Sequence, residues 1–198
     1  MPCIRVSVDG TSIVEAATRG VSILDVNVRG ERSSDAYSIL DVCGATWSQH
    51  YPHLDHFWLE NLPLRSGQIV TVSLLEDESH ATAAARTVEK PFDLDRSAIE
   101  QRYEQKRAEM RAARKLRDAI AFTMILPTGA SKSVATLPQE HSCEFSFIWS
   151  GLTPDRADVW LRCIDITARF SADQNSPCNS IVKETVALGS EVRLVLGG

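Results

Sequence analysis

The sequence predicts a mainly β (α+β) protein with two similar small antiparallel lobes, each a β-sandwich or partly open barrel, joined by one long charged helix. Three observations predict this class. Short runs alternate apolar and polar residues and end at glycines, as strands and turns do. The order of these runs is repeated in the second half of the chain. Between the halves, residues 93–120 contain no glycine or proline and are rich in helix-forming residues.

We expect the first lobe over residues 1–80. It opens with IRVSVDGTSIVEAAT, in which two alternating runs flank Asp9-Gly10. This dipeptide is a strong hairpin signal, because a type I′ turn needs positive φ at both central residues. The runs VSILDVNV and AYSILDV then stop at Gly30 and Gly44, and QIVTVSLL follows Gly67. Each run is predicted to be a strand.

The segment HYPHLDHFWLENLPLRSG, residues 50–67, predicts a short amphipathic helix near 52–62. Pro52 is favoured in the first turn of a helix. The apolar residues that would form one helical face are Leu54, Phe57, Trp58 and Leu62. The polar residues that would lie mainly on the wet face are His53, Asp55, His56 and Glu60.

The same stretch raises a metal-site alternative, because His50, His53 and His56 lie close together in sequence beside Asp55. The common helical zinc pattern places two histidines at i and i+4 with a general-base glutamate between them. His53 and His56 have the spacing i and i+3, and His50 precedes Pro52 and would have to fold back. We therefore expect no metal site and no cofactor, and these three histidines are the weak metal candidates.

A connecting segment is expected over residues 81–120, with the long helix from 93 to 120. Acidic residues lie near its start and basic residues near its end, which suits the helix dipole. The late basic residues are Lys106, Arg107, Arg111, Arg114, Lys115 and Arg117. No aromatic residue lies among them to stack on nucleotides, and the net charge of the chain is −5. We therefore interpret the helix as a solvated connection and do not expect nucleic-acid binding.

The second lobe is expected over residues 121–198. AFTMILPTGASKSVATL is predicted to be a strand, a turn and a strand, followed by the strands CEFSFIW, DVWLRCIDITARF and SEVRLVL. Glycines end corresponding runs at similar spacing in the two lobes: Gly10, Gly30 and Gly67 against Gly129, Gly151 and Gly189. This pattern indicates duplication of a β unit of about 75 residues, although glycines at hairpin turns would produce part of the match by themselves.

The five cysteines, at positions 3, 43, 143, 163 and 178, are odd in number and widely spaced. That spacing argues against a disulfide framework and against a structural zinc site. The N-terminal residues lack the pattern of a signal peptide, and no apolar run approaches the roughly 20 residues of a membrane span. A cytoplasmic protein is therefore expected. No common catalytic motif is present, so we do not expect an enzyme.

The strings HLDHFWLENLPLRSGQIVTVSLLED, IRVSVDGTSIVEAA and GVSILDVNVRG resemble small bacterial β-rich proteins of toxin and immunity gene neighbourhoods. The shared features are an opening VxVDG-type hairpin and a closing W-L-x-x-L-x-L-x-x-G-x-x-V-x-V strand. The resemblance covers residues 4–77. It implies an immunity-like protein without an assigned catalytic activity, and it implies no functional residues.

We therefore expect a protein-binding module, specifically an immunity-type protein that binds and occludes a cognate toxin. The acidic charge suits a basic toxin domain as the partner, and no membrane is expected to bind. The residues expected to contact the partner are His53, Asp55, His56, Glu60, Glu76, Asp77 and Glu78. Two alternatives remain: a structural protein that assembles into an oligomer, and a metal-dependent enzyme that uses His50, His53, Asp55 and His56.

Overall fold

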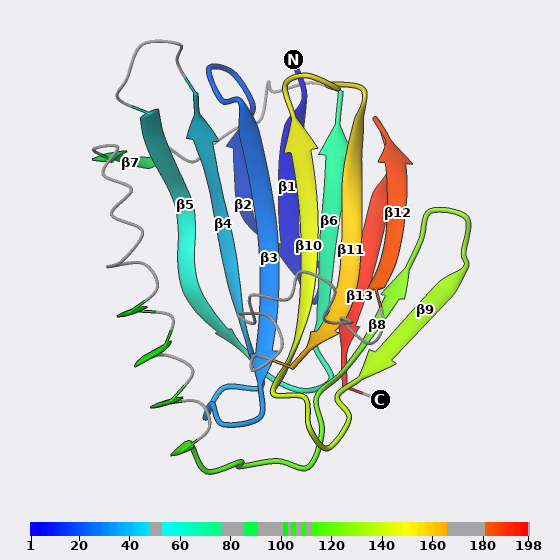
Figure 1. Ribbon diagram of the computed structural model, residues 1–198. Helices are drawn as coiled ribbons and strands as arrows, with labels where there is room; N and C mark the ends of the chain where they lie inside the picture. The colour runs from blue at the N-terminus through cyan, green and yellow to red at the C-terminus, as the bar shows by residue number, and fades with distance from the viewer. Residues whose placement is uncertain are drawn as a thin grey trace.

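The computed structural model describes residues 1–47, 53–76, 85–90, 101–102, 104–105, 108–109, 112–165 and 181–197. In these residues the chain forms two antiparallel β-sheets that pack face to face (Figure 1). The mainly β class is therefore confirmed. None of the described residues belongs to a helix long and apolar enough to cross a membrane.

One sheet, named sheet A, has six strands, and the other, sheet B, has seven. The strands of sheet A, in spatial order, are β2 (Thr11–Ala17), β1 (Cys3–Val8), β6 (Ile69–Leu75), β13 (Glu191–Leu196), β8 (Ala121–Ile125) and β9 (Ser131–Ala135). Those of sheet B are β12 (Ile181–Ala187), β11 (Arg156–Ile164), β10 (Ser142–Ser150), β3 (Ile23–Glu31), β4 (Ser38–Thr46), β5 (His53–Leu64) and β7 (Arg86–Lys90).

The first hairpin forms at the predicted dipeptide. Asp9 and Gly10 both have positive φ, 50° and 80°, as a type I′ turn requires. The Asp9 carboxylate accepts hydrogen bonds from the Ile69 backbone N–H (2.9 Å) and from the Gln68 side chain (2.8 Å). These two bonds lower the pKa of Asp9, and they connect the β1–β2 turn to the start of β6.

The core lies between the two sheets, because successive strand residues point alternately inward and outward. In β3 the inward residues are Leu24, Val26 and Val28, all fully buried. The residues between them, Asp25 and Asn27, therefore lie on the outer face of sheet B. Bulky side chains such as Phe145 and Phe147 of β10 fill the same interior.

The strand order is symmetric about the middle of each sheet. In sheet A, β6 and β13 pair at the centre, β1 and β8 lie next to them, and β2 and β9 lie outside. In sheet B, β3 and β10 pair, flanked by β4 and β11 and then by β5 and β12. Two copies of one β unit related by a local twofold axis would produce this order. Among the described strands, β7 alone has no counterpart.

The prediction of two separate lobes is wrong in its architecture, because both sheets contain strands from both halves of the chain (Figure 1). The central pairs β3–β10 and β6–β13 join the halves through backbone hydrogen bonds. A connecting helix is therefore not what holds the halves together.

The long charged helix predicted over 93–120 is also wrong. Residues 93–100 lie outside the described residues, and residues 113–120 are irregular. Helical backbone is described in between at Gln101, Arg102, Glu104, Gln105, Ala108, Glu109 and Ala112, which form no continuous described helix. The good helix-forming composition is overridden after residue 112 by tertiary contacts. Arg117 Nη1 donates to three carbonyl oxygens of the β3–β4 connection, at 2.7 to 3.0 Å.

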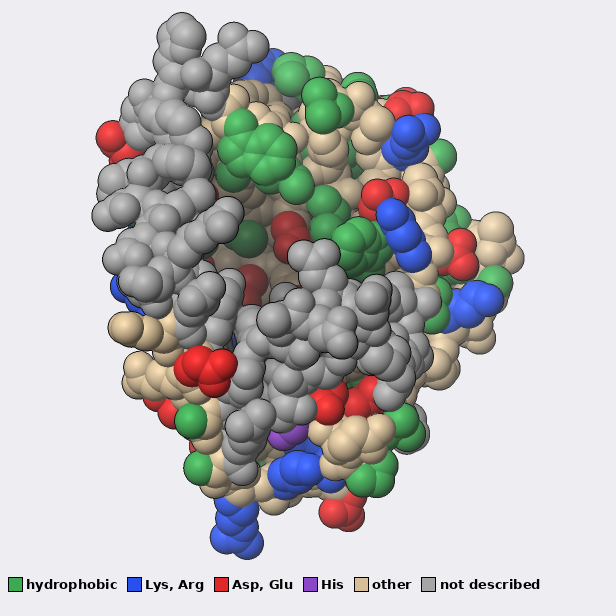
Figure 2. All heavy atoms as spheres, in the orientation of Figure 1, with side chains coloured by type: hydrophobic (Ala, Val, Ile, Leu, Met, Phe, Trp, Pro, Cys, Tyr) green, Lys and Arg blue, Asp and Glu red, His purple; other side chains and the backbone are tan. Residues whose placement is uncertain are grey.

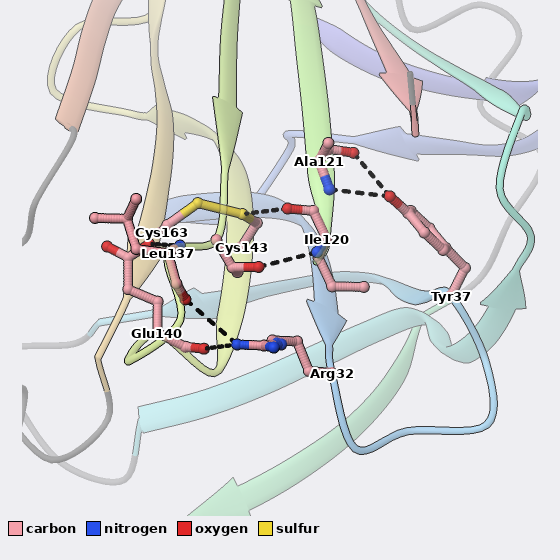
Figure 3. The surroundings of a disulfide bond; sticks show 9 residues. Arg32, Tyr37, Ile120, Ala121, Leu137, Glu140, Cys143 and Cys163 are labelled. Atoms are coloured by element: carbon pink, nitrogen blue, oxygen red, sulfur yellow. Dashed lines mark hydrogen bonds between the residues drawn. A yellow bond between two sulfur atoms is a disulfide. The ribbon is translucent and has the colours of Figure 1, made fainter. Parts of the chain in front are cut away.

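The entrance to β8 shows how these contacts fix the chain (Figure 3). Ile120 is fully buried in the core. The Tyr37 hydroxyl accepts a hydrogen bond from the Ala121 N–H (3.0 Å) and donates one to the Ala121 carbonyl (3.1 Å). The buried Arg32 donates through Nη1 to three carbonyl oxygens between Leu137 and Glu140, at 3.1 to 3.3 Å. Arginine side chains therefore connect the loops at this end of the sandwich.

The short helix predicted near 52–62 is wrong, because the described part of this segment is the strand β5. β5 pairs with β4 on one side and with β7 on the other. The β4–β5 register shifts near Val42, and Asn61 has a positive φ of 55°. Such irregularities break the simple alternation of a strand, so the apolar residues acquired a spacing that resembled a helical face.

The cysteine spacing argued against a disulfide framework, and the structure contains a disulfide that this reasoning did not predict. Cys143 of β10 and Cys163 of β11 are direct register partners and form a buried disulfide (Figure 3). Both lie on the inner face of sheet B. A wide sequence spacing did not reveal the pair, because strand register decides which residues lie opposite each other.

Candidate functional site

The outer face of sheet B is more buried than a solvated sheet face. Its central strands place Asp25, Asn27, Glu144 and Ser146 outward. Glu144 and Ser146 are nevertheless only 8% and 6% exposed. Figure 2 looks onto this face and shows a hollow with acidic side chains at its floor and hydrophobic side chains beside it. We call the surface around Asp25, Asn27, Glu144 and Ser146 the acidic hollow.

One carboxylate of the acidic hollow is fully compensated. Glu144 Oε2 accepts hydrogen bonds from Arg162 Nε (2.8 Å) and Nη2 (2.6 Å). Glu144 Oε1 accepts a third from Asn27 Nδ2 (2.9 Å), which also donates to Ser146 Oγ (3.0 Å). Charge-assisted bonds of this kind are the strong ones. Arg162 and Asn27 therefore offset the charge of Glu144 although its side chain is buried.

The other central carboxylate is not compensated. Asp25 Oδ1 is buried and has no hydrogen-bond partner. Desolvation, and then the negative charge of Glu144, raise the pKa of Asp25 from 3.8 to about 7. Arg162 opposes this rise and Asp41 adds to it. Asp25 thus binds a proton near neutral pH, because within the described part of the chain no cation is bonded to its buried oxygen.

Aromatic side chains with cations over them flank the acidic hollow. On β11, Trp160 lies beneath the Arg162 guanidinium (5.8 Å to the ring centroid) and the Lys183 ammonium (5.3 Å). The Trp160 Nε1–H is buried without a hydrogen-bond partner. On the opposite side, Arg86 covers the ring of Phe57 at 4.6 Å. The face therefore already accommodates cationic groups against aromatic rings.

Two exposed apolar side chains lie at the end of this face where β4 and β10 terminate. Trp47 is 60% exposed and Leu152 is 90% exposed. Ser22 connects their loops, since its hydroxyl accepts from the Trp47 N–H and its carbonyl accepts from the Gly151 N–H, both at 2.9 Å. We call Trp47 and Leu152 the apolar rim.

The expected partner-contact residues are divided among different places. His53, Asp55, His56 and Glu60 lie on β5, and Glu76 follows β6 in the other sheet. Glu60 accepts three hydrogen bonds from Arg86, at 2.7 to 3.0 Å. Asp77 and Glu78 lie outside the described residues.

The strand also separates the candidate metal ligands. Asp55 pairs with Ala45 and His56 with Gly44, so these two consecutive side chains point to opposite faces. His56 contacts the hydroxyls of Thr46 (2.8 Å) and Thr87 (3.3 Å). His50 lies outside the described residues, and within those described no three His, Cys, Asp or Glu side chains converge as a metal site.

Sequence reasoning missed Asp25, Glu144, Arg162 and Trp160. In the sequence, Asp25 and Glu144 are polar residues in alternating runs, which is the ordinary pattern of a solvated sheet face. Their chemistry depends on the pairing of β3 with β10, strands from different halves of the chain. No protein-family model, curated protein or solved structure matches this chain. The resemblance to immunity-like proteins therefore stays a prediction.

Proposed function

We propose that this chain is a protein-binding module and that the outer face of sheet B binds the partner. The observation that carries this proposal is Asp25 in the acidic hollow, whose Oδ1 is buried without a hydrogen-bond partner. Such a group destabilises the free protein when it is ionised and becomes favourable when a complementary charge arrives. The proposed partner is therefore basic, and an immunity-type role, in which the chain occludes a toxin, fits this chemistry.

The apolar rim supports a protein partner. Trp47 is 60% exposed, and tryptophan is a residue type enriched among interface hot spots.

The test uses the purified full chain as bait in a lysate of its source organism, followed by identification, purification and reconstitution of any stoichiometric partner. We expect Trp47→Ala to weaken the reconstituted complex at least tenfold. The matched control is Leu137→Ala, because Leu137 is also exposed but lies before the start of β10, whereas the apolar rim lies where β4 and β10 end. The control should change affinity less than threefold.

An immunity-type role further requires that one equivalent of the chain abolishes the partner's toxic activity. Absence of any stoichiometric partner would contradict the proposed function. Equal losses of affinity in Trp47→Ala and Leu137→Ala would contradict the assignment of the binding face.

A further inference from the structure

A constant sequence offset relates the two central strands of sheet B. Asn27 and Ser146 are register partners, joined at 3.0 Å, and lie 119 residues apart. A shift of 119 residues converts the bounds of β3 (Ile23–Glu31) into those of β10 (Ser142–Ser150). A local twofold axis between Asn27 and Ser146 therefore relates the two sides of the acidic hollow.

The two sides differ at one charged position. The same offset takes Asp25 to Glu144 and Cys43 to Arg162. Asp25 is the register partner of Cys43, and Glu144 is the register partner of Arg162. On one side the carboxylate therefore has an arginine beside it. On the other side the equivalent position carries a thiol, which supplies no guanidinium.

The side with Asp25 retains a carboxyl oxygen that could accept hydrogen bonds from a cation. The Asp25 carboxyl has a buried oxygen with no hydrogen-bond partner. Among the described residues, the charged groups that act on it are Glu144, Arg162 and Asp41, and Arg162 is already bonded to Glu144. A cation that also donates N–H groups would satisfy both the charge and the unused acceptor.

We propose that the acidic hollow binds the guanidinium group of an arginine side chain on the partner protein, beside Asp25 and Cys43, where the N-terminal half of the face lacks the arginine that the C-terminal half has at Arg162. This inference rests on the proposed protein-binding function and specifies the partner's chemistry. The Glu144–Arg162 pair is the internal precedent for the contact.

Arginine fits this position better than lysine or a metal ion. Its guanidinium is planar, donates along two parallel directions and is more weakly hydrated than an ammonium, so it is less costly to bury. A metal would need several protein ligands, and the described residues contain no group of three candidate ligands. The aromatic rings of Trp160 and Phe57, each already covered by a cation, are compatible with a further guanidinium on this face.

The experiment follows the carbon-13 resonance of the Asp25 carboxyl group while the full chain is titrated with N-acetyl-arginine amide. N-acetyl-citrulline amide is the neutral isostere, and N-acetyl-lysine amide tests for simple charge attraction. We expect saturable binding of the arginine probe, with at least tenfold weaker binding of citrulline and weaker binding of lysine. The apparent affinity should fall about tenfold per pH unit below the pKa of Asp25, because protons compete for the carboxylate.

Three variants assign the site. Asp25→Asn should abolish the saturable binding, whereas Asp158→Asn, on the same face but paired with Thr185 and Lys183, should leave it unchanged. Cys43→Arg should place a guanidinium beside Asp25 and lower the titration midpoint of Asp25. It should also weaken binding of the arginine probe at least tenfold. The Asp25→Asn result decides the proposal by itself if the Cys43→Arg protein does not fold.

Equal binding of arginine and citrulline, or unchanged binding to Asp25→Asn, would overturn the guanidinium site. A probe that binds at Asp25 while no protein partner exists would leave the site standing and remove the proposed function. A reconstituted partner complex whose affinity is unchanged by Asp25→Asn would support the proposed function and overturn the guanidinium site.

Discussion

Replacement of Asp25 by asparagine is expected to stabilise the protein above neutral pH. The reason is the raised pKa of the Asp25 carboxyl, which moves from 3.8 to about 7 through desolvation and through the nearby charge of Glu144. In the unfolded chain this group ionises near its ordinary pKa. The stability that protonated Asp25 contributes is therefore fully present below pH 4 and is lost as the pH rises through 7.

The magnitude follows from the size of the pKa shift. A rise of about three units corresponds to about 4 kcal/mol of lost stability at pH 8, at 1.36 kcal/mol per unit. Relaxation of the site reduces this loss. We therefore expect the free energy of unfolding of Asp25→Asn to exceed that of the wild-type protein by about 2–4 kcal/mol at pH 8. The two proteins should be nearly equal at pH 4, because both then carry a neutral side chain at this position.

The assay is urea denaturation of both proteins from pH 4 to pH 8, with Asp158→Asn as the control. The Asp158 side chain is 45% exposed, so its replacement should give a small difference with little dependence on pH. If Asp25→Asn is less stable than the wild-type protein at pH 8, the reasoning is refuted. That result would mean that a cation of the chain already compensates the carboxylate.

Three further predictions concern sheet B and can be checked by the same denaturation assay. Glu144→Gln should destabilise the protein by about 2–4 kcal/mol, because it leaves the mostly buried Arg162 without its counter-ion; equal stability would show that the pair contributes nothing. Replacing both cysteines of the disulfide with alanine should cost about 3 kcal/mol, since the bond closes a loop between residues 20 apart; a stability that reductant does not change would contradict this. Gly44→Ala should cost about 1–3 kcal/mol through overpacking, because its new Cβ would lie 2.6 Å from a backbone oxygen. Gly151→Ala is the matched control, since its nearest contact would be 3.5 Å, and similar losses in the two glycine variants would argue against the packing explanation.

Local sequence determined the parts of this fold that depend on neighbouring residues. Asp9-Gly10 adopts the left-handed conformation that a tight hairpin needs, and the alternating runs became strands. Both properties arise from backbone sterics and from side-chain alternation within a few residues. Local spacing failed at β5, because the shifted register with β4 and the positive φ of Asn61 are not visible in a single strand.

Amino-acid composition did not correctly predict the structure of the segment before β8. Its alanines and charged residues favour a helix in isolation. Arg117 instead donates to backbone carbonyls of the β3–β4 connection, and Ile120 enters the core. Helix propensity amounts to a few tenths of a kcal/mol per residue, so several such contacts are enough to override it.

The tertiary structure alone decided the chemistry of the outer face of sheet B. Asp25 and Glu144 each look like solvated residues of an amphipathic strand in the sequence. Pairing of β3 with β10 brings the two carboxyl groups close enough to repel each other, and pairing of β11 with β10 places an arginine beside Glu144. Solvent exclusion and the distance between charges are properties of strands brought together from distant parts of the chain. For that reason the sequence by itself specified where the strands form, and only their assembly decided which carboxyl group lacks a partner.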